Sequence, residues 1–339
     1  MRDEQRVPGV GRWSVAALFA IVVLGLASIV GSGGGGGCAL APGPCPGDFP
    51  NEPADPTVTP GDAVIQVGGS VTFSADAPSF GNASYQWFRA PKGASAAAIS
   101  GATAATYTLA GAQLIDDGST FTVHVTGTFE GKSAFRSSQP ATVAVSSMPP
   151  VVFQDTEFAP ADWVATAIVQ PPGGPTHVEQ QVATGGNPGA YRQVALSMPG
   201  GNSVLTAFST YQGGTYDPAS QGPIYLIGFS EDCVALPGVL GVGPQLLLEQ
   251  DGRRYAAGAG GFCDATWRKQ DFLRASLARA DFFQLDGPAC AAGTACPDFS
   301  ANGQPMTFGF VNSNQGSTGF AGASGGFGVD NWVVKVWRR

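Results

Sequence analysis

Apolar and polar residues alternate through residues 64–145, in short runs that turn residues separate about every 10 positions. A period of two places alternate side chains on one face of a strand. Regular turn spacing with this period is typical of a β-sandwich. We therefore expect the following residues to face one shared core: Val71, Phe73, Ala75, Tyr85, Trp87, Tyr107, Leu109, Phe121, Val123, Val125, Val143 and Val145.

The alternation stops at Met148-Pro149-Pro150 and then resumes. Only residues 268–283 have a pattern that fits a short helix, and the same segment could equally contain a strand. The sequence therefore predicts a second all-β domain over residues 150–339. Its inward positions are expected to include Tyr225, Ile227, Phe229, Leu246, Leu248, Phe308, Phe310, Val329, Trp332, Val334 and Val336.

The N-terminus has a different pattern, an uncharged apolar run over residues 13–30 that follows three arginines. This is the form of an export signal, and the run also just reaches the length of a membrane-spanning helix. Residues 1–32 are therefore expected to be a signal peptide or a membrane anchor, with lipidation at Cys38 as a further alternative. Residues 33–59, rich in Gly and Pro, are expected to form a stalk. The protein is thus expected to be exported, to the cell surface, the periplasm or the medium, with membrane contact only through residues 13–30.

Composition narrows the class of protein further. The chain has 49 Gly, 26 Pro and only 12% charged residues, which suits a turn-rich sheet protein better than a helical bundle. Its net charge is −8, which argues against a nucleic-acid partner because phosphate binding needs a basic surface.

The six cysteines are an even number in a chain expected to be exported, which favours full pairing into disulfides. The chain has no C-x-x-C motif and only two His, so zinc binding is not expected. Proximity in sequence favours the pairs Cys38–Cys45, Cys233–Cys263 and Cys290–Cys296.

Residues 60–147 resemble a bacterial immunoglobulin-like domain. Ala75 stands where the family often has its first cysteine, and Trp87 follows twelve residues later, like the core tryptophan of that family. Phe121 and Val123 occupy the places of the usual tyrosine and second cysteine. The resemblance therefore implies an immunoglobulin-like β-sandwich that lacks the family disulfide and depends on apolar packing around Trp87. Such domains act as spacers or as binding modules.

Residues 150–339 resemble a concanavalin A-like jelly roll of the laminin-G or carbohydrate-binding type, through four short matches. These are Phe153-Gln154-Asp155 with Asp162-Trp163, Gly185 to Gly189 with Tyr191, Tyr216-Asp217-Pro218, and Gly328 to Trp332. The resemblance implies a larger β-sandwich, in which exposed aromatic rings would stack on sugars. The candidates for that role are Tyr211, Tyr216, Tyr225, Tyr255, Trp267 and Trp332.

The same resemblance implies one metal ion and no other cofactor. Jelly-roll modules of this kind often hold a structural Ca²⁺ where the first and last strands meet, and Ca²⁺ binds six to eight oxygen atoms. Asp155 and Glu157 lie near the first strand and Asp330 and Asn331 in the last, so these four are the candidate ligands. The alternative is that Asp330-Asn331 only forms a turn.

Catalytic machinery is not recognisable. The pair Glu249 and Asp251 has the spacing that places two carboxylates on one strand face, but Asp251-Gly252 is better explained as a hairpin turn. We therefore expect a non-enzymatic surface or secreted protein, an immunoglobulin-like spacer that carries a jelly-roll module for carbohydrate or for another surface protein. The alternatives are a secreted polysaccharide hydrolase and a purely structural envelope protein.

Overall fold

The structure is a computed structural model that describes residues 52–171, 174–238, 243–257, 263–271, 277–285 and 296–338. Strands make up most of these residues. The all-β prediction is confirmed for these residues. Among them, no helix is long and apolar enough to span a membrane. The predicted signal or anchor, most of the stalk, and Cys38, Cys45 and Cys290 lie outside the described residues.

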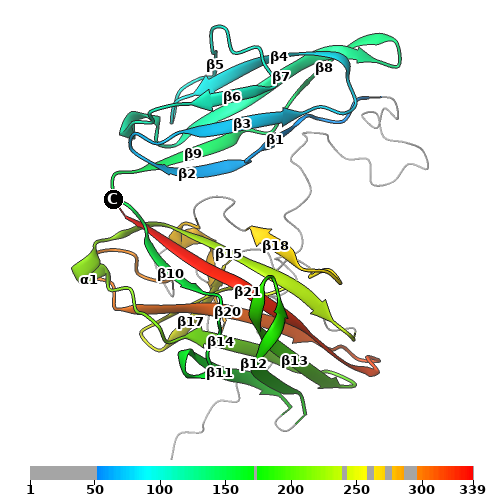
Figure 1. The fold of residues 1–339 in the computed structure, drawn as a ribbon, viewed down its shortest axis with the longest axis vertical. Helices are drawn as coiled ribbons and strands as arrows, with labels where there is room; N and C mark the ends of the chain where they lie inside the picture. The colour runs from blue at the N-terminus through cyan, green and yellow to red at the C-terminus, as the bar shows by residue number, and fades with distance from the viewer. Residues whose placement is uncertain are drawn as a thin grey trace, which may run out of the picture. The chain divides into compact units, whose positions relative to one another are not determined.

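The first strand set forms two sheets (Figure 1). One has the order β1-β3-β6, and the other has the order β2-β9-β7-β4-β5 with β8 also paired to β7. β2 and β9 are parallel, whereas the other pairs are antiparallel. The strands are β1 (Thr57–Thr59), β2 (Asp62–Gln66), β3 (Val71–Asp76), β4 (Gly81–Ala90), β5 (Ala97–Ala98), β6 (Thr106–Leu109), β7 (Ser119–Phe129), β8 (Lys132–Ser137) and β9 (Ala141–Ser146).

The core of this set is the one that the alternation predicts. Trp87 is fully buried, and its indole N–H donates to the Ala104 carbonyl over 3.0 Å. Phe73 stacks on Phe121 with ring centroids 5.1 Å apart. All twelve predicted inward residues are buried or partly buried and belong to one apolar cluster. Ala75 and Val123 are both buried in this apolar cluster.

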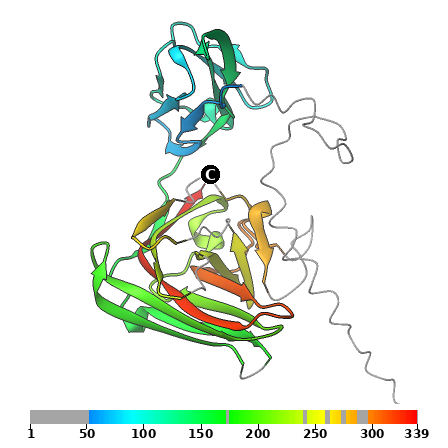
Figure 2. The ribbon, with the colours of Figure 1, turned by 90° about the vertical axis from the view of Figure 1, so that its right-hand side faces the viewer.

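The second strand set also forms two sheets, with the orders β12-β13-β21-β15-β18 and β11-β14-β20-β16-β17-β19, and β10 pairs with β21 (Figures 1 and 2). One short helix, α1 (Pro218–Gln221), precedes β15. The strands are β10 (Val151–Asp155), β11 (Trp163–Gln170), β12 (Thr176–Gly186), β13 (Gly189–Pro199), β14 (Val204–Tyr211), β15 (Ile224–Leu236), β16 (Gln245–Gln250), β17 (Arg253–Ala257), β18 (Arg268–Asp271), β19 (Phe282–Gln284), β20 (Met306–Gln315) and β21 (Gly322–Arg338).

Side chains from both sheets of the second set meet in one large core. The predicted inward residues belong to this core with one exception, Tyr225, which is only partly buried. The sequence allowed either a short helix or a strand over residues 268–283. Residues 268–271 and 282–284 are strands, which favours the strand alternative at both ends of that segment.

A disulfide joins Cys233 of β15 to Cys263, whose Cα atoms lie 5.4 Å apart, so this predicted pair is confirmed. The bond ties β15 to the segment that leads into β18, the edge strand that pairs with it. Cys296 is also disulfide-bonded, and its predicted partner Cys290 lies outside the described residues.

Replacing both Cys233 and Cys263 with Ala is expected to lower the free energy of unfolding. The two residues are 30 positions apart in sequence. In the chain-entropy model, a bridge closing a loop of this length contributes about 3.5 kcal/mol by restricting the unfolded chain. Urea unfolding of the variant and the parent would measure the difference. An unchanged midpoint would show that the bridge does not constrain the unfolded chain.

Candidate functional site

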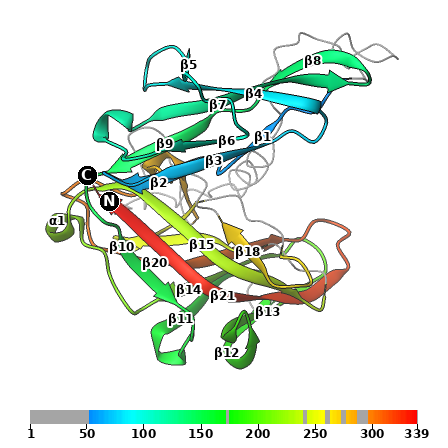
Figure 3. The same ribbon diagram turned by 45° about the horizontal axis from the view of Figure 1, so that its top comes forward.

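β21 changes its neighbour along one edge, and the change creates a polar cluster. Its first half pairs with β13 up to Val329, and its second half pairs with β10 from Trp332 (Figure 3). On the other edge it pairs with β15 throughout, but two residues of β21, Asn331 and Trp332, lie opposite the single residue Glu231. This is a β-bulge, in which the extra residue interrupts the ladder and leaves backbone groups to be satisfied by other means.

The side chains of Asp330 and Asn331 make hydrogen bonds at this bulge. The carboxylate of Asp330, fully buried, accepts from the backbone N–H of Asn187 through one oxygen and from that of Asn331 through the other. The amide of Asn331 donates to the Asn187 carbonyl and, over 2.7 Å, to Asp232. Asn187 also donates to Asp232 over 3.1 Å. The cluster therefore fastens the β12–β13 turn onto β21 and β15.

The pKa of Asp330 is raised overall. Burial is the largest cause and the carboxylates of Asp232 and Glu157 add to it, whereas the two backbone hydrogen bonds lower the pKa.

The residue types at two positions make this arrangement possible. Asn331 has a φ of 49°, in the left-handed region that Asn tolerates better than most residues. At Gly186 a Cβ atom would come within 2.6 Å of the Asp330 carboxylate, so that only glycine fits.

The four predicted calcium ligands do not form one group. Asp155 accepts from the N–H groups of Glu157 and Phe158 through one oxygen and from the indole of Trp163 over 2.7 Å through the other. Among the described residues, no group of three or more His, Cys, Asp or Glu side chains is placed to hold a metal ion. The calcium prediction therefore gains no support from this arrangement, in which Asp330 and Asn331 bind backbone and side-chain groups of the protein itself.

Three of the six predicted sugar-stacking aromatics lie in the core. Tyr216 and Trp332 are fully buried, and Tyr255 is 2% exposed, so none of them offers a ring face to a ligand. Trp332 packs against Trp163 with centroids 5.2 Å apart. Of these three, only Trp332 is among the inward positions that the alternation predicts, and there the alternation was a better guide than aromatic chemistry.

The other three aromatics are partly buried and are engaged within the protein. Tyr211 packs against Trp163 and Trp332. Trp267 donates its indole N–H to Gly185 over 2.8 Å and meets Tyr191 edge to face. Tyr225 lies on β15 next to the buried residue Leu226. The structure therefore does not gather the six rings on one exposed surface.

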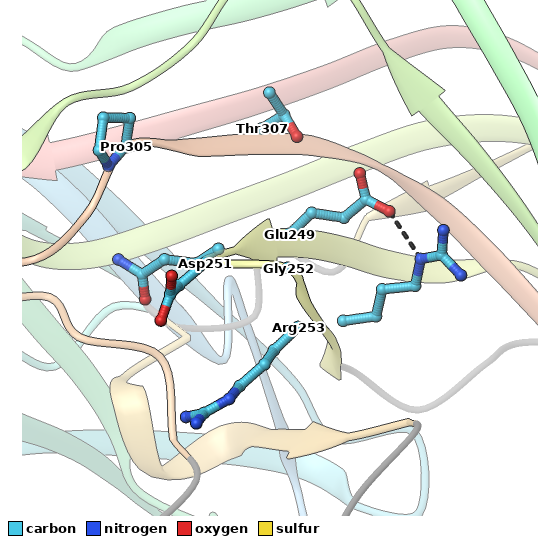
Figure 4. Close-up of a pocket in the computed structure, with 8 residues that line it drawn as sticks. Glu249, Asp251, Gly252, Arg253, Pro305 and Thr307 are labelled. Atoms are coloured by element: carbon cyan, nitrogen blue, oxygen red, sulfur yellow. Dashed lines mark hydrogen bonds and ion pairs between the residues drawn. The ribbon is translucent and has the colours of Figure 1, made fainter.

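A hollow of about 460 Å³ lies at the turn between β16 and β17 (Figure 4). Glu249 and Thr307 are opposite each other on β16 and β20, and both line it. The Nε atom of Arg254 donates to Glu249 over 2.8 Å, and its guanidinium lies 4.4 Å from the centre of the Phe208 ring. The lining residues are Glu249, Gln250, Asp251, Gly252, Arg253, Arg254, Pro305 and Thr307.

The turn beside this hollow has the conformation that Asp251-Gly252 predicts. Both residues have positive φ, 51° and 68°, in a two-residue connection between paired strands. Gln250, buried at the end of β16, donates to the carbonyls of Asp298 and Gln304 and accepts from the Asp298 N–H. The hairpin end and the loop after residue 296 are thus held together. Arg253 is exposed at the rim of the hollow.

A second hollow, of about 340 Å³, contains an ion pair that the sequence did not reveal. The side chain of Glu179, on β12, is fully buried and pairs with Arg192 of β13 over 2.8 Å. Arg192 also lies over the ring of Trp163, 5.4 Å from its centre. The inward period of β12 could have located Glu179, but nothing in its sequence neighbourhood identifies Arg192 as its partner. The lining residues are Pro160, Trp163, Ala165, Glu179, Gln180, Gln181 and Arg192.

Glu231 is a further buried acid. It lies on β15 between the core residues Phe229 and Cys233, is fully buried, and neither of its carboxylate oxygens has a hydrogen-bond partner. Burial, with a smaller contribution from the Asp232 carboxylate, raises the pKa of Glu231 well above its ordinary value of 4.5.

In comparisons with known proteins, no family model matches this chain, and no curated protein matches it. The interpretation of the site therefore depends on its geometry and chemistry.

Replacing Asp330 with Ala should destabilise the second strand set. The substitution leaves the N–H groups of Asn187 and Asn331 without their acceptor, and each unsatisfied buried group costs about 1–3 kcal/mol. Chemical denaturation should show a loss of roughly 2–5 kcal/mol. Asp162→Ala, at an exposed position, is the control. Equal stability of the two variants would contradict a fastening role for the cluster.

Glu231 should make the protein less stable as the pH rises. Its folded-state pKa is raised, so its contribution is favourable below about pH 4.5 and is lost as the pH rises through the folded-state value. Glu231→Gln should therefore raise the melting temperature at pH 8 and change it little at pH 4. Asp162→Asn, which removes an exposed carboxylate, should leave the pH profile unchanged. Parallel pH profiles for the parent and Glu231→Gln would refute the assignment.

Proposed function

We propose that this chain is a non-enzymatic, exported binding protein, in which an immunoglobulin-like spacer carries a jelly-roll module that binds carbohydrate. The hollow at the β16–β17 turn carries this proposal. It combines hydrogen-bond donors and acceptors within one volume of about 460 Å³, inside the range of ligand pockets.

The strand orders support the two modules. In the first set, β1-β3-β6 forms one sheet and the other sheet contains β9-β7-β4. The strands β2 and β9, which lie near the start and at the end of this set, pair side by side. This is compatible with the two-sheet, Trp-centred sandwich of immunoglobulin-like domains. In the second set, two large antiparallel sheets enclose a single core, an arrangement compatible with a jelly roll. The boundary between residues 147 and 150 stays a prediction.

The charge at the hollow favours a neutral, hydroxyl-bearing ligand. Glu249 and Asp251 are balanced by Arg253 and Arg254, so neither sign dominates. Arg254 is bonded to Glu249, and among the described contacts no ion pair or hydrogen bond engages the side chain of Arg253. Sugar hydroxyls both donate and accept hydrogen bonds, so they can pair with a carboxylate, a guanidinium and Thr307 together.

Hydrolysis is less well supported. A glycosidase needs two carboxyl groups that flank the scissile bond, one of them poised to give a proton. Here the carboxylate of Glu249 is ion-paired with Arg254 over 2.8 Å and so is already engaged within the protein. Asp251 belongs to the tight turn and is exposed.

The test uses the full-length chain on a glycan array, followed by titration with a glycan that binds. Arg253→Ala is expected to weaken binding roughly ten-fold, because one hydrogen bond from a charged group is worth about 1.5–3 kcal/mol. Arg268→Ala, which removes an exposed guanidinium from β18, should bind like the parent.

Absence of binding to any glycan would refute the carbohydrate proposal. Equal affinity of the Arg253 variant would place the site elsewhere in the chain. Release of reducing ends from a polysaccharide incubated with the parent chain would instead favour the hydrolase alternative.

A further inference from the structure

The carboxylate of Glu179 is bonded unequally at its two oxygens. Oε2 accepts from two nitrogens of Arg192, each at 2.8 Å, and from the hydroxyl of Ser209 at 2.6 Å. Oε1 is buried and accepts no hydrogen bond, and Nε2 of His177 lies 4.0 Å from it. A buried carboxylate oxygen without a donor is costly, so a donor at this position would be favourable.

Glu179 lines the second hollow, between the edge strands β11 and β12. Gln181, two residues further along β12 and so on the same face, donates its amide to the Glu157 carbonyl over 2.6 Å. Its own amide oxygen remains available as an acceptor. Pro160 and Ala165 supply apolar wall. The hollow therefore presents acceptors to a ligand, whereas its principal donor, Arg192, is already bonded to Glu179.

These features select a class of ligand. An anion would meet the buried carboxylate of Glu179, and an ammonium group would meet the guanidinium of Arg192. A neutral ligand that donates several hydrogen bonds avoids both conflicts. The volume of about 340 Å³ is at the lower end of ligand pockets and suits a single sugar ring.

We infer that the hollow between β11 and β12 binds one monosaccharide unit, with a sugar hydroxyl donating to Oε1 of Glu179. This inference rests on the proposed carbohydrate-binding function and gives that function a second subsite, distinct from the hollow at the β16–β17 turn. Burial raises the pKa of Glu179, and Arg192, Ser209 and His177 lower it. The pKa of Glu179 is raised overall, and Arg192 is the largest of the groups that counteract the effect of burial.

The experiment titrates the full-length chain with glucose, galactose, mannose and N-acetylglucosamine, and detects binding by saturation-transfer NMR. Ala165→Trp should fill the hollow from its exposed rim and leaves both residues of the ion pair in the chain. The matched control is Val178→Trp, because Val178 is 62% exposed on the opposite face of β12 from Glu179. Thermal unfolding of each variant verifies that it is folded.

The parent should bind at least one of the four sugars. Ala165→Trp should bind it at least about ten-fold more weakly, whereas Val178→Trp should retain its affinity. If Ala165→Trp fails to fold, Gln181→Ala removes one acceptor from the hollow and should weaken binding several-fold.

Two results would overturn the inference and leave the proposed function intact. One is glycan-array binding without binding of any of the four sugars. The other is monosaccharide binding that Arg253→Ala abolishes and Ala165→Trp retains. A parent chain that binds neither the array nor the monosaccharides would refute the inference and the proposed function together.

Discussion

The second strand set depends on how β21 keeps its backbone hydrogen-bonded while its neighbour changes. This strand runs from Gly322 to Arg338 and lies between β15 on one edge and, in succession, β13 and β10 on the other. Where β13 gives way to β10, peptide groups would lose their partners, and a buried peptide group without a hydrogen bond is costly. Asp330, Asn331, Asn187 and Asp232 replace the missing ladder with side-chain hydrogen bonds.

The hollow lined by Glu179 and Arg192 depends on β12 and β13, whose positions follow from this arrangement. Arg192 is opposite Val329 in the ladder, one residue before Asp330, so fixing the turn at Asn187 also fixes the strand that supplies the partner of Glu179. A buried ion pair is not by itself a source of stability, because desolvation offsets most of the attraction. Its presence at the edge of the core is therefore not explained by stability alone, and the sugar site proposed above would give the pair a role.

Alternation in the sequence was sufficient to predict the all-β class, the core around Trp87 and the turn at Asp251-Gly252, because each follows from local side-chain period or backbone preference. Proximity in sequence was sufficient to pair Cys233 with Cys263. The hollows could not be predicted in this way. Glu179 and Arg192 come together because β12 and β13 form a hairpin in one register, and Glu249 meets Arg254 through another. The same limit applies to Asp330 and Asn331, whose type and position suggested a metal site. Their oxygens and nitrogens instead bind a turn more than 140 residues away in sequence.

The position of Arg254 bears on the thermodynamics of any ligand at the β16–β17 turn. Its guanidinium is stacked on Phe208 and bonded to Glu249 before a ligand arrives. Ordering a long, rotamer-rich side chain on association costs about 0.5–1.5 kcal/mol, and here that ordering belongs to folding. The Arg254 guanidinium is therefore already positioned before a ligand binds. Discrimination among ligands would come from their fit to this fixed group. Arg253, exposed on the same hairpin, is free to reorient, so one turn offers an immobile guanidinium beside an adaptable one.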